Sequence, residues 1–273
     1  MNVVVIGKSG NLAASLAQIA PDFTYLSKEE FSFDKLNDIK PEFIINTAAY
    51  TKVDLAETEK ASALELNCEF PKKLAMWCKE NDAYLIHIST DYVFDGEGAA
   101  PYKTTDITNP VNFYGYTKRL GEEAVLGNCP KSIIIRTSWL YSSYGNNFVK
   151  TMIRLLSEKP EIKVVNDQIG CPTSCLNLAE VITKIIQNPI PGLYHYTDKD
   201  IMSWYDFAVK ISDIIGNGRV LPITSNEYPL PAKRPMYSVL NCAVICEKYD
   251  IVQKEFDESL KKVINDYCRN SVV

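Results

Sequence analysis

A tyrosine and a lysine four residues apart, Tyr114 and Lys118, are the side chains whose spacing first suggests chemistry. On a helix, residues four apart lie on one face. A tyrosine with a pKa of ~10 is a weak acid at neutral pH, and a neighbouring ammonium group favours the phenolate and lowers that pKa. The pair would then suit proton donation to a reacting oxygen. Taken alone, it is more typical of an exposed helix with no catalytic role.

A glycine turn stands near the N-terminus, where Gly7-Lys8-Ser9-Gly10-Asn11-Leu12 follows a short apolar segment. Glycine lets the backbone approach a pyrophosphate closely, and the first turn of a following helix presents N–H groups with a partial positive charge. Ala13 stands where a third small residue packs helix on strand. A tight turn without a ligand has the same pattern, but its place at the first strand–helix junction predicts a dinucleotide site.

Hydroxyl and carboxylate side chains follow another apolar segment, in Ser89-Thr90-Asp91. In open α/β sheets, ligands bind at the carboxyl ends of the strands, where a hydroxyl can hydrogen-bond a reacting oxygen. Alternatively, the hydroxyls simply end the strand and Asp91 begins a turn. The glycine turn, the strand-end hydroxyl and the tyrosine–lysine pair occur in an order that favours one shared site.

The elements that must position these residues alternate between apolar strands and amphipathic helices, which predicts a Rossmann-type, doubly wound parallel sheet. We expect a dinucleotide-binding domain over residues 1–160. Residues 161–273 are expected to form mainly a smaller substrate-binding lobe, with some elements returning to the first domain. The expected strands are 3–6, 23–26, 43–47, 84–89, 132–138, 163–165, 193–196 and 219–222, and the expected helices are 11–19, 57–81, 114–126, 147–157, 176–187, 203–215 and 255–267.

The composition is that of a globular protein with a large core: 273 residues, 46% of them hydrophobic. A net charge of −5 disfavours broad nucleic-acid binding, which needs a basic surface. Neither a signal peptide nor an apolar run of ~18 residues is evident, so we expect no membrane partner and a cytoplasmic protein. The eight cysteines are expected to be reduced, buried thiols, because only two histidines are present to complete a zinc site.

The order of these motifs is that of the short-chain dehydrogenases/reductases, and the wider sequence resembles one branch, the dTDP-4-dehydrorhamnose reductases. The segment from Ile45 to Glu57, INTAAYTKVDLAE, resembles a stretch of that family. The resemblance spans nearly the whole chain, and its other blocks are 89–96, 109–110, 114–118, 136–141, 147–152, 167–173, 203–208 and 231–235.

The resemblance implies NAD(P)H-dependent reduction of the C4 ketone of a nucleotide sugar, dTDP-4-dehydro-6-deoxy-L-mannose, to dTDP-L-rhamnose. It implies that Tyr114 donates the proton, that Lys118 binds the nicotinamide ribose and lowers the pKa of the tyrosine, and that Thr90 hydrogen-bonds the ketone oxygen or the tyrosine. Asp91 would lie near the sugar, and Trp139 would form an aromatic wall. The implied cofactor-binding residues are Gly7, Lys8, Ser9, Gly10, Asn11, Leu12, Ala48, Ala49, Tyr50, Tyr114 and Lys118.

Arg234, with Lys233, is the candidate for the substrate's diphosphate; the alternative is a solvated turn. NADPH is the expected cofactor, with NADH as a second possibility. Ser27 and Lys28 would meet a 2′-phosphate, whereas Glu29 or Glu30 would suit NADH. No metal is expected, because Ser15 occupies the position where some relatives have a metal-binding carboxylate. The chain is expected to be a monomer or a homodimer.

Two other kinds of protein remain open. Another nucleotide-sugar reductase or an epimerase would share the scaffold, and an epimerase would show no net consumption of cofactor. Regulatory subunits of methionine adenosyltransferase also resemble this family and act as binding partners, although the presence of Thr90, Tyr114 and Lys118 argues for catalysis. Consumption of NAD(P)H by the isolated chain separates these alternatives.

Overall fold

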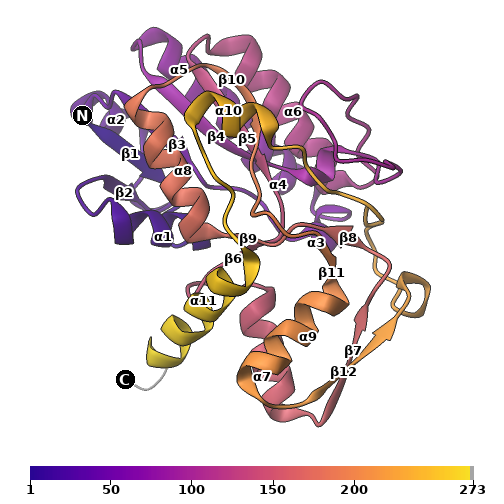
Figure 1. Ribbon diagram of the computed structural model, residues 1–273. Helices are drawn as coiled ribbons and strands as arrows, with labels where there is room; N and C mark the ends of the chain where they lie inside the picture. The colour runs from indigo at the N-terminus through magenta and orange to yellow at the C-terminus, as the bar shows by residue number, and fades with distance from the viewer. Residues whose placement is uncertain (271–273) are drawn as a thin grey trace.

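The computed structural model describes residues 1–270 and is built around a parallel sheet of six strands (Figure 1). The strand order is β10-β5-β4-β3-β1-β2. All six strands lie close to positions expected from the sequence, and the doubly wound α/β fold is confirmed. Their bounds are β1 Val3–Ile6, β2 Thr24–Leu26, β3 Phe43–Asn46, β4 Tyr84–Thr90, β5 Ser132–Thr137 and β10 Gly192–His195.

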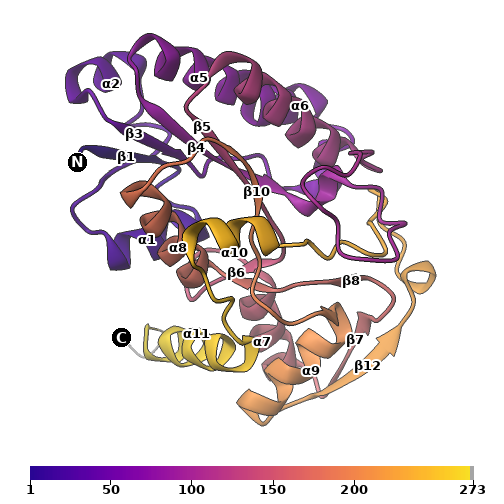
Figure 2. The ribbon, with the colours of Figure 1, turned by 45° about the horizontal axis from the view of Figure 1, so that its top comes forward.

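Helices cover both faces of this sheet (Figure 2). One face packs against α1 (Asn11–Ile19), α8 (Cys175–Gln187) and α10 (Ala243–Tyr249). The other face packs against α2 (Phe33–Ile39), α5 (Phe70–Glu80) and α6 (Phe113–Asn128). Because both faces are covered, the central strands carry continuous apolar runs, and every residue of β1, β3 and β5 is buried.

A second lobe lies beyond the carboxyl end of the sheet (Figures 1 and 2). Its apolar core is shared by the parallel pair β7 (Glu161–Val165) and β12 (Arg219–Ile223) and by α7 (Phe148–Glu158), α9 (Trp204–Ile215) and α11 (Phe256–Asn270). Short strand pairs join the two lobes. They are β6 (Leu140–Tyr141) with β9 (Thr173–Ser174), and β8 (Ile169–Gly170) with β11 (Met202–Ser203).

The expected division at residue 160 remains a prediction, and the elements on its two sides interleave. Strand β10 and helices α8 and α10 follow that residue but pack in the first lobe. Helix α7 precedes it but packs against α9 in the second lobe. A boundary in sequence therefore does not correspond to a boundary in space.

The long helix expected over residues 57–81 is largely confirmed, because residues 60–80 are helical without a break, but it starts at Lys60 and contains a π-helical turn. Helix α4 (Lys60–Leu64) runs into a π-helical turn, η1 (Glu65–Glu69), and α5 follows, with Pro71 in its first turn. Proline has no N–H to donate and clashes with the preceding turn, which favours a wider turn upstream. The short helix α3 (Val53–Ala56) and the 3-10 turns η2 (Asp91–Val93) and η3 (Ser225–Glu227) complete the elements.

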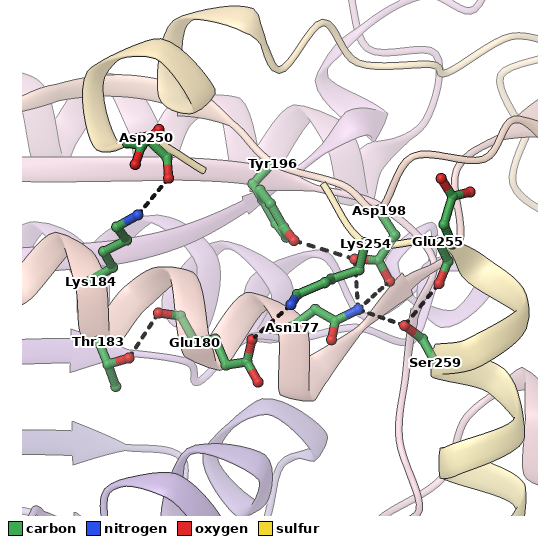
Figure 3. A network of polar contacts seen from close by, with 10 residues as sticks. All are labelled: Asn177, Glu180, Thr183, Lys184, Tyr196, Asp198, Asp250, Lys254, Glu255 and Ser259. Atoms are coloured by element: carbon green, nitrogen blue, oxygen red, sulfur yellow. Dashed lines mark hydrogen bonds and ion pairs between the residues drawn. The ribbon is translucent and has the colours of Figure 1, made fainter. Parts of the chain in front are cut away.

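A buried carboxylate attaches the C-terminal helix to the sheet region (Figure 3). Asp198 accepts hydrogen bonds from the backbone N–H of Ser174 at 2.9 Å and from Asn177 at 3.0 Å. Asn177 in turn donates to Ser259 of α11 at 2.8 Å. Burial raises the pKa of Asp198 to about 7. The lobes are therefore joined through a polar connection as well as through apolar packing.

All eight cysteines are free thiols, and six of them are buried as expected, whereas the burial expected of the other two is wrong. Cys246 is half-buried and Cys268 is exposed. Over residues 1–270, none of the helices combines the length and the apolar character needed to cross a bilayer.

Candidate active site

A cavity of about 1250 Å³ opens at the carboxyl end of the sheet, where the sequence places its motifs. Its volume suits a dinucleotide together with a second ligand. The lining includes thirteen of the fifteen predicted site residues: Gly7, Ser9, Gly10, Asn11, Leu12, Ala48, Ala49, Tyr50, Thr90, Asp91, Tyr114, Lys118 and Trp139. Lys8 and Arg234 lie outside this lining.

The glycine turn has the geometry that a pyrophosphate requires. Gly7 has a φ of +103°, and a Cβ added to it would lie 2.7 Å from Thr47 Oγ1. Any side chain at this position would therefore clash with the end of the neighbouring strand. Gly10 forms the N-cap of α1 without a side-chain hydrogen bond, so the first N–H groups of the helix are available to an anion. The residues present thus fit the diphosphate of a nicotinamide dinucleotide.

Asn11 connects this turn to the segment that enters the second lobe. Its Oδ1 accepts hydrogen bonds from Ser142 at 2.8 Å and from Asn147 at 3.1 Å, and its Nδ2 donates to the carbonyl of Asn146 at 3.1 Å. Asn147 is also the N-cap of α7. Sequence reasoning missed Ser142 and Asn147 in this role, although a capping asparagine before an amphipathic segment was a visible signal.

Tyr114 lies in the first turn of α6, where the helix start fixes its position. The N-cap Asn112 accepts from the N–H of Gly115 at 2.8 Å and donates to the carbonyl of Lys233 at 2.8 Å. Burial raises the pKa of Tyr114 to about 12, while the hydroxyl of Thr90 acts in the opposite direction. Tyr114 is therefore a protonated phenol at neutral pH, next to the strand-end hydroxyl.

Lys118 is 2% exposed, and its Nζ donates to the carbonyl oxygen of Ile88 at 2.7 Å. Burial lowers the pKa of Lys118 to about 8, and the carboxylate of Glu122 acts against that shift. The expected lowering of the tyrosine's pKa by Lys118 is not among the causes acting on Tyr114 in this structure. Here Thr90 is the group that favours the phenolate, because the ammonium group is directed at the strand.

A buried ion pair between Glu122 and Arg136 lies one helical turn after Lys118. Glu122, one turn after Lys118, accepts two hydrogen bonds from Arg136 of β5, at 2.8 and 2.6 Å. Ser89 donates to the same carboxylate at 2.5 Å. Glu122 and Arg136 are 3% and 4% exposed. Sequence reasoning missed this network because its members are separated along the chain, and only Glu122, four residues after Lys118, offered a local signal.

Asp91 is almost fully buried at the cavity and differs from an ordinary surface carboxylate. Its Oδ1 accepts from Thr90 at 3.0 Å. Its Oδ2 is buried and has no hydrogen-bond partner within residues 1–270. Burial raises the pKa of Asp91 to about 6, against the lowering effects of the side chains of Ser238 and Thr90. The unpartnered oxygen is suited to accept a hydrogen bond from a ligand hydroxyl.

The π-helical turn places Asn67 where it joins two parts of the site. Its Oδ1 accepts from the N–H of Tyr50 at 2.8 Å, and its Nδ2 donates to the carbonyl of Tyr50 at 3.1 Å and to Thr117 at 3.0 Å. Tyr50 follows β3, and Thr117 precedes Lys118 in α6. Asn67 was not identified from the sequence, where it lies inside an expected uninterrupted helix. π-turns are frequent at functional sites.

Charged residues of both signs stand after β2, where the adenosine ribose of a dinucleotide is usually bound. Lys28 lines the cavity. Glu30 accepts from the N–H of Ser27 at 2.9 Å, and that hydrogen bond is the main cause that lowers its pKa. Glu30 also pairs with Lys8 at 3.4 Å on the exposed surface. This arrangement leaves Lys28 as the cation that lines the cavity after β2.

Arg234 is engaged in an ion pair with Asp54, with Nη2 and Oδ2 2.7 Å apart. Asp54 also accepts from the N–H of Ala232 at 3.2 Å, and Arg234 donates to the carbonyl of Ala232 at 2.8 Å. The pair therefore ties the proline-rich segment to α3, and Arg234 is not a solvated turn residue. Its expected contact with a diphosphate stays a prediction.

Trp139 lines the cavity at the end of β5, as a wall residue must. Its backbone has a φ of +47°, and its indole stacks on that of Trp204 with ring centroids 3.6 Å apart. Within residues 1–270, no group of three or more histidine, cysteine, aspartate or glutamate side chains is arranged to hold a metal ion.

The doubly wound sheet, the glycine turn and the convergence of Thr90, Tyr114 and Lys118 define a nicotinamide-dependent oxidoreductase of the short-chain dehydrogenase/reductase type. Residues 1–269 match the model of one family in particular, the RmlD substrate binding domain. The chain belongs to that family.

Its relatives share the whole length of the chain. A dTDP-4-dehydrorhamnose reductase of Aggregatibacter actinomycetemcomitans is 39% identical, and the match covers 96% of this chain and 97% of the relative. The crystal structure of a dTDP-4-dehydrorhamnose reductase from Clostridium acetobutylicum superposes with a TM-score of 0.92 at 40% identity, covering 97% of this chain and 99% of the other. A dTDP-4-dehydrorhamnose reductase from Bacillus anthracis, solved in complex with NADP, gives a TM-score of 0.93 at 36% identity, covering 97% and 100%.

Proposed function

We propose that this chain uses NADPH to reduce the C4 ketone of dTDP-4-dehydro-6-deoxy-L-mannose, which gives dTDP-L-rhamnose. The observation that carries the proposal is the convergence of Thr90, Tyr114 and Lys118 in the cavity that also contains the glycine turn. The full-length similarity to proteins named dTDP-4-dehydrorhamnose reductase supports the choice of substrate.

The proposed chemistry needs a hydride for the ketone carbon and a proton for its oxygen. NADPH, when bound, supplies the hydride. Tyr114 supplies the proton, and a pKa of about 12 keeps its phenol protonated at neutral pH. Because an alkoxide is a stronger base than a phenolate, this proton transfer is favourable. Thr90 is placed to hydrogen-bond the growing negative charge, which lowers the barrier because the donor is already oriented.

Lys118 and Asp91 have different tasks in this proposal. Lys118 hydrogen-bonds the nicotinamide ribose. Asp91 accepts a hydrogen bond from a sugar hydroxyl with its unpartnered Oδ2. Trp139 forms one wall for the sugar, and Arg234 remains the proposed contact of the diphosphate, which requires a rearrangement of its pair with Asp54.

The cofactor assignment follows from the charges near the glycine turn. Lys28 lines the cavity and would attract a 2′-phosphate, whereas Glu30 is held by Ser27 and Lys8. The relative from Bacillus anthracis binds NADP. NADPH is therefore the proposed cofactor, with NADH also accepted. A cytoplasmic location and a monomeric or homodimeric state remain part of the proposal.

The test follows the absorbance of reduced nicotinamide when purified protein is mixed with NADPH and dTDP-4-dehydro-6-deoxy-L-mannose. Tyr114→Phe keeps the ring and removes the proton donor, so we expect kcat to fall at least ~100-fold, within the usual range for general acid catalysis. Tyr116→Phe is the matched control, because Tyr116 lies on the same helix and is 38% exposed.

Three outcomes would contradict the proposal or part of it. A folded wild-type protein that binds NADPH but consumes neither NADPH nor NADH with this sugar would remove the substrate assignment. Product formation without net consumption of cofactor would indicate an epimerase. Equal losses in the Tyr114 and Tyr116 variants would remove the catalytic role of Tyr114.

A further inference from the structure

The indole of Trp139 is held on one face and along one edge by two residues that do not line the cavity. Trp204 stacks on it with ring planes inclined by 10° and ring centroids 3.6 Å apart. Gly170 lies against the ring, because a Cβ added to that glycine would be 2.7 Å from Trp139 Cε2. Trp139 lines the cavity, whereas Trp204 and Gly170 do not. The surface left to the cavity is therefore the part of the indole away from Trp204.

The two supports are fixed to each other by local structure. Trp204 is the first residue of α9, which begins with a capping box between Ser203 and Asp206. Strand β11, which contains Met202 and Ser203, pairs with β8 so that Met202 lies opposite Gly170. Gly170 thus lies in the strand pair that leads directly into α9 and Trp204, while Trp139 follows β5 of the first lobe.

The backbone of Trp139 also depends on its surroundings. A φ of +47° is an unfavourable conformation for a bulky residue, and such a conformation persists only where neighbouring contacts impose it. The N–H of Thr173 donates to the carbonyl of Trp139 at 3.2 Å, and the stack with Trp204 fixes the side chain. Trp204 packs in turn against Phe148 of α7, so the apolar core of the second lobe extends to the cavity wall.

We propose that Trp204 and Gly170 are positioning residues that hold the indole of Trp139 so that its open face receives the sugar ring of a nucleotide sugar. This inference rests on the proposed function of the cavity. It adds two residues that affect substrate affinity through Trp139 without lining the cavity themselves. The apolar face of a deoxysugar suits an aromatic ring presented in a fixed plane. Because Trp139 contacts the sugar before and during reduction alike, its misplacement weakens binding more than it slows turnover.

The kinetic test compares Trp204→Leu, which removes the stack, with Trp204→Phe, which keeps an aromatic ring. For the leucine variant we expect KM for the nucleotide sugar to rise about tenfold, the order of one aromatic contact, with kcat changed less than about twofold. The phenylalanine variant should restore most of the affinity. Gly170→Ala displaces the indole without touching Trp204 and should raise KM in the same way, which keeps the test valid if the leucine variant folds poorly.

A binding measurement makes the test independent of turnover. The chain has three tryptophans, so Trp77→Phe combined with Trp204→Phe leaves Trp139 as the sole tryptophan. Trp77 belongs to α5, where its Nε1 donates to Asn37 at 2.8 Å. Titration with dTDP-L-rhamnose should change the Trp139 fluorescence. The dissociation constant should be about tenfold higher in the double variant with Trp204→Leu than in the double variant with Trp204→Phe. Trp77→Phe alone is the control and should leave KM unchanged.

The outcomes separate this inference from the proposed function. KM values in Trp204→Leu and Gly170→Ala equal to that of the wild type, together with equal dissociation constants for the leucine and phenylalanine variants, would overturn the positioning role. A fluorescence response with weaker binding in the leucine variant, but without NADPH oxidation by the wild type, would support the positioning role and overturn the proposed reaction. A fall in kcat alone, with KM unchanged, would also overturn the inference.

Discussion

Gly115 permits the helix that carries Tyr114 and Lys118 to approach the strand-end segment closely. A Cβ added to Gly115 would lie 2.0 Å from the carbonyl oxygen of Tyr92, whereas ordinary contact begins at 3.4 Å. Because real Cβ atoms essentially never approach closer than 3.0 Å, the two segments must separate by at least about 3.0 − 2.0 = 1.0 Å in Gly115→Ala. The clash is with backbone, so a side-chain rotation cannot relieve it.

This separation acts directly on the proposed reaction. Tyr92 follows Thr90 and Asp91, so moving α6 away from it also moves Tyr114 away from Thr90. A misplacement of ~1 Å in an active site can cost ~100-fold in rate, and we expect kcat of Gly115→Ala to fall by about that factor. Overpacking should also lower the free energy of unfolding by about 1–3 kcal/mol.

The same helix offers a control at Gly127. Gly127 is exposed, and a Cβ added there meets nothing within 4 Å. Gly127→Ala should therefore leave kcat unchanged and raise the free energy of unfolding by about 0.4–1 kcal/mol, because alanine restricts the unfolded chain. Both variants are assayed at saturating NADPH and nucleotide sugar, and their stability is measured by urea denaturation. Wild-type kcat in Gly115→Ala, or an equal loss in Gly127→Ala, would refute the reasoning.

Three further predictions concern buried charges. Glu122→Gln leaves the guanidinium of Arg136 buried without its counter-charge, so urea denaturation should show a loss of about 3–5 kcal/mol, and a loss below about 1 kcal/mol would contradict the role of the pair. Lys118 loses its charge as the pH rises through about 8, so kcat/KM should fall above that pH. Because the unfolded lysine keeps its proton up to about 10.5, the free energy of unfolding should rise between pH 8 and pH 10.5. An activity profile without an alkaline decline would argue against a required ammonium group. For Asp91, burial raises the pKa from 3.8 to about 6, so the ionised form destabilises the fold progressively between those values and fully above them. Asp91→Asn should therefore raise the free energy of unfolding at pH 7 by about 1–3 kcal/mol and lose that gain below pH 3.8. The same variant should lower kcat/KM, and an unchanged kcat/KM would contradict the proposed contact with the sugar.

Local patterns predicted most of the fold. The apolar segment expected as a strand over 132–138 forms β5 (Ser132–Thr137), and the helix expected over 203–215 forms α9 (Trp204–Ile215). These features depend on residues adjacent in sequence, where periodicity and capping leave few alternatives. The resemblance to the reductase family is confirmed by the matching family model and by full-length relatives. The roles assigned to individual site residues stay predictions.

Local sequence patterns could not predict the contacts between segments that are distant in the chain. The π-turn at Asn67 looks like uninterrupted helix in sequence, and its function depends on Tyr50 and Thr117, 17 and 50 residues away. The stack of Trp204 on Trp139 likewise joins two lobes. The order of the motifs predicted one shared site at a sheet edge, and the resemblance of the wider sequence to one reductase family predicted the reaction. The pKa values and the plane of the indole depend on burial and on close packing, which arise only when segments far apart in the chain meet.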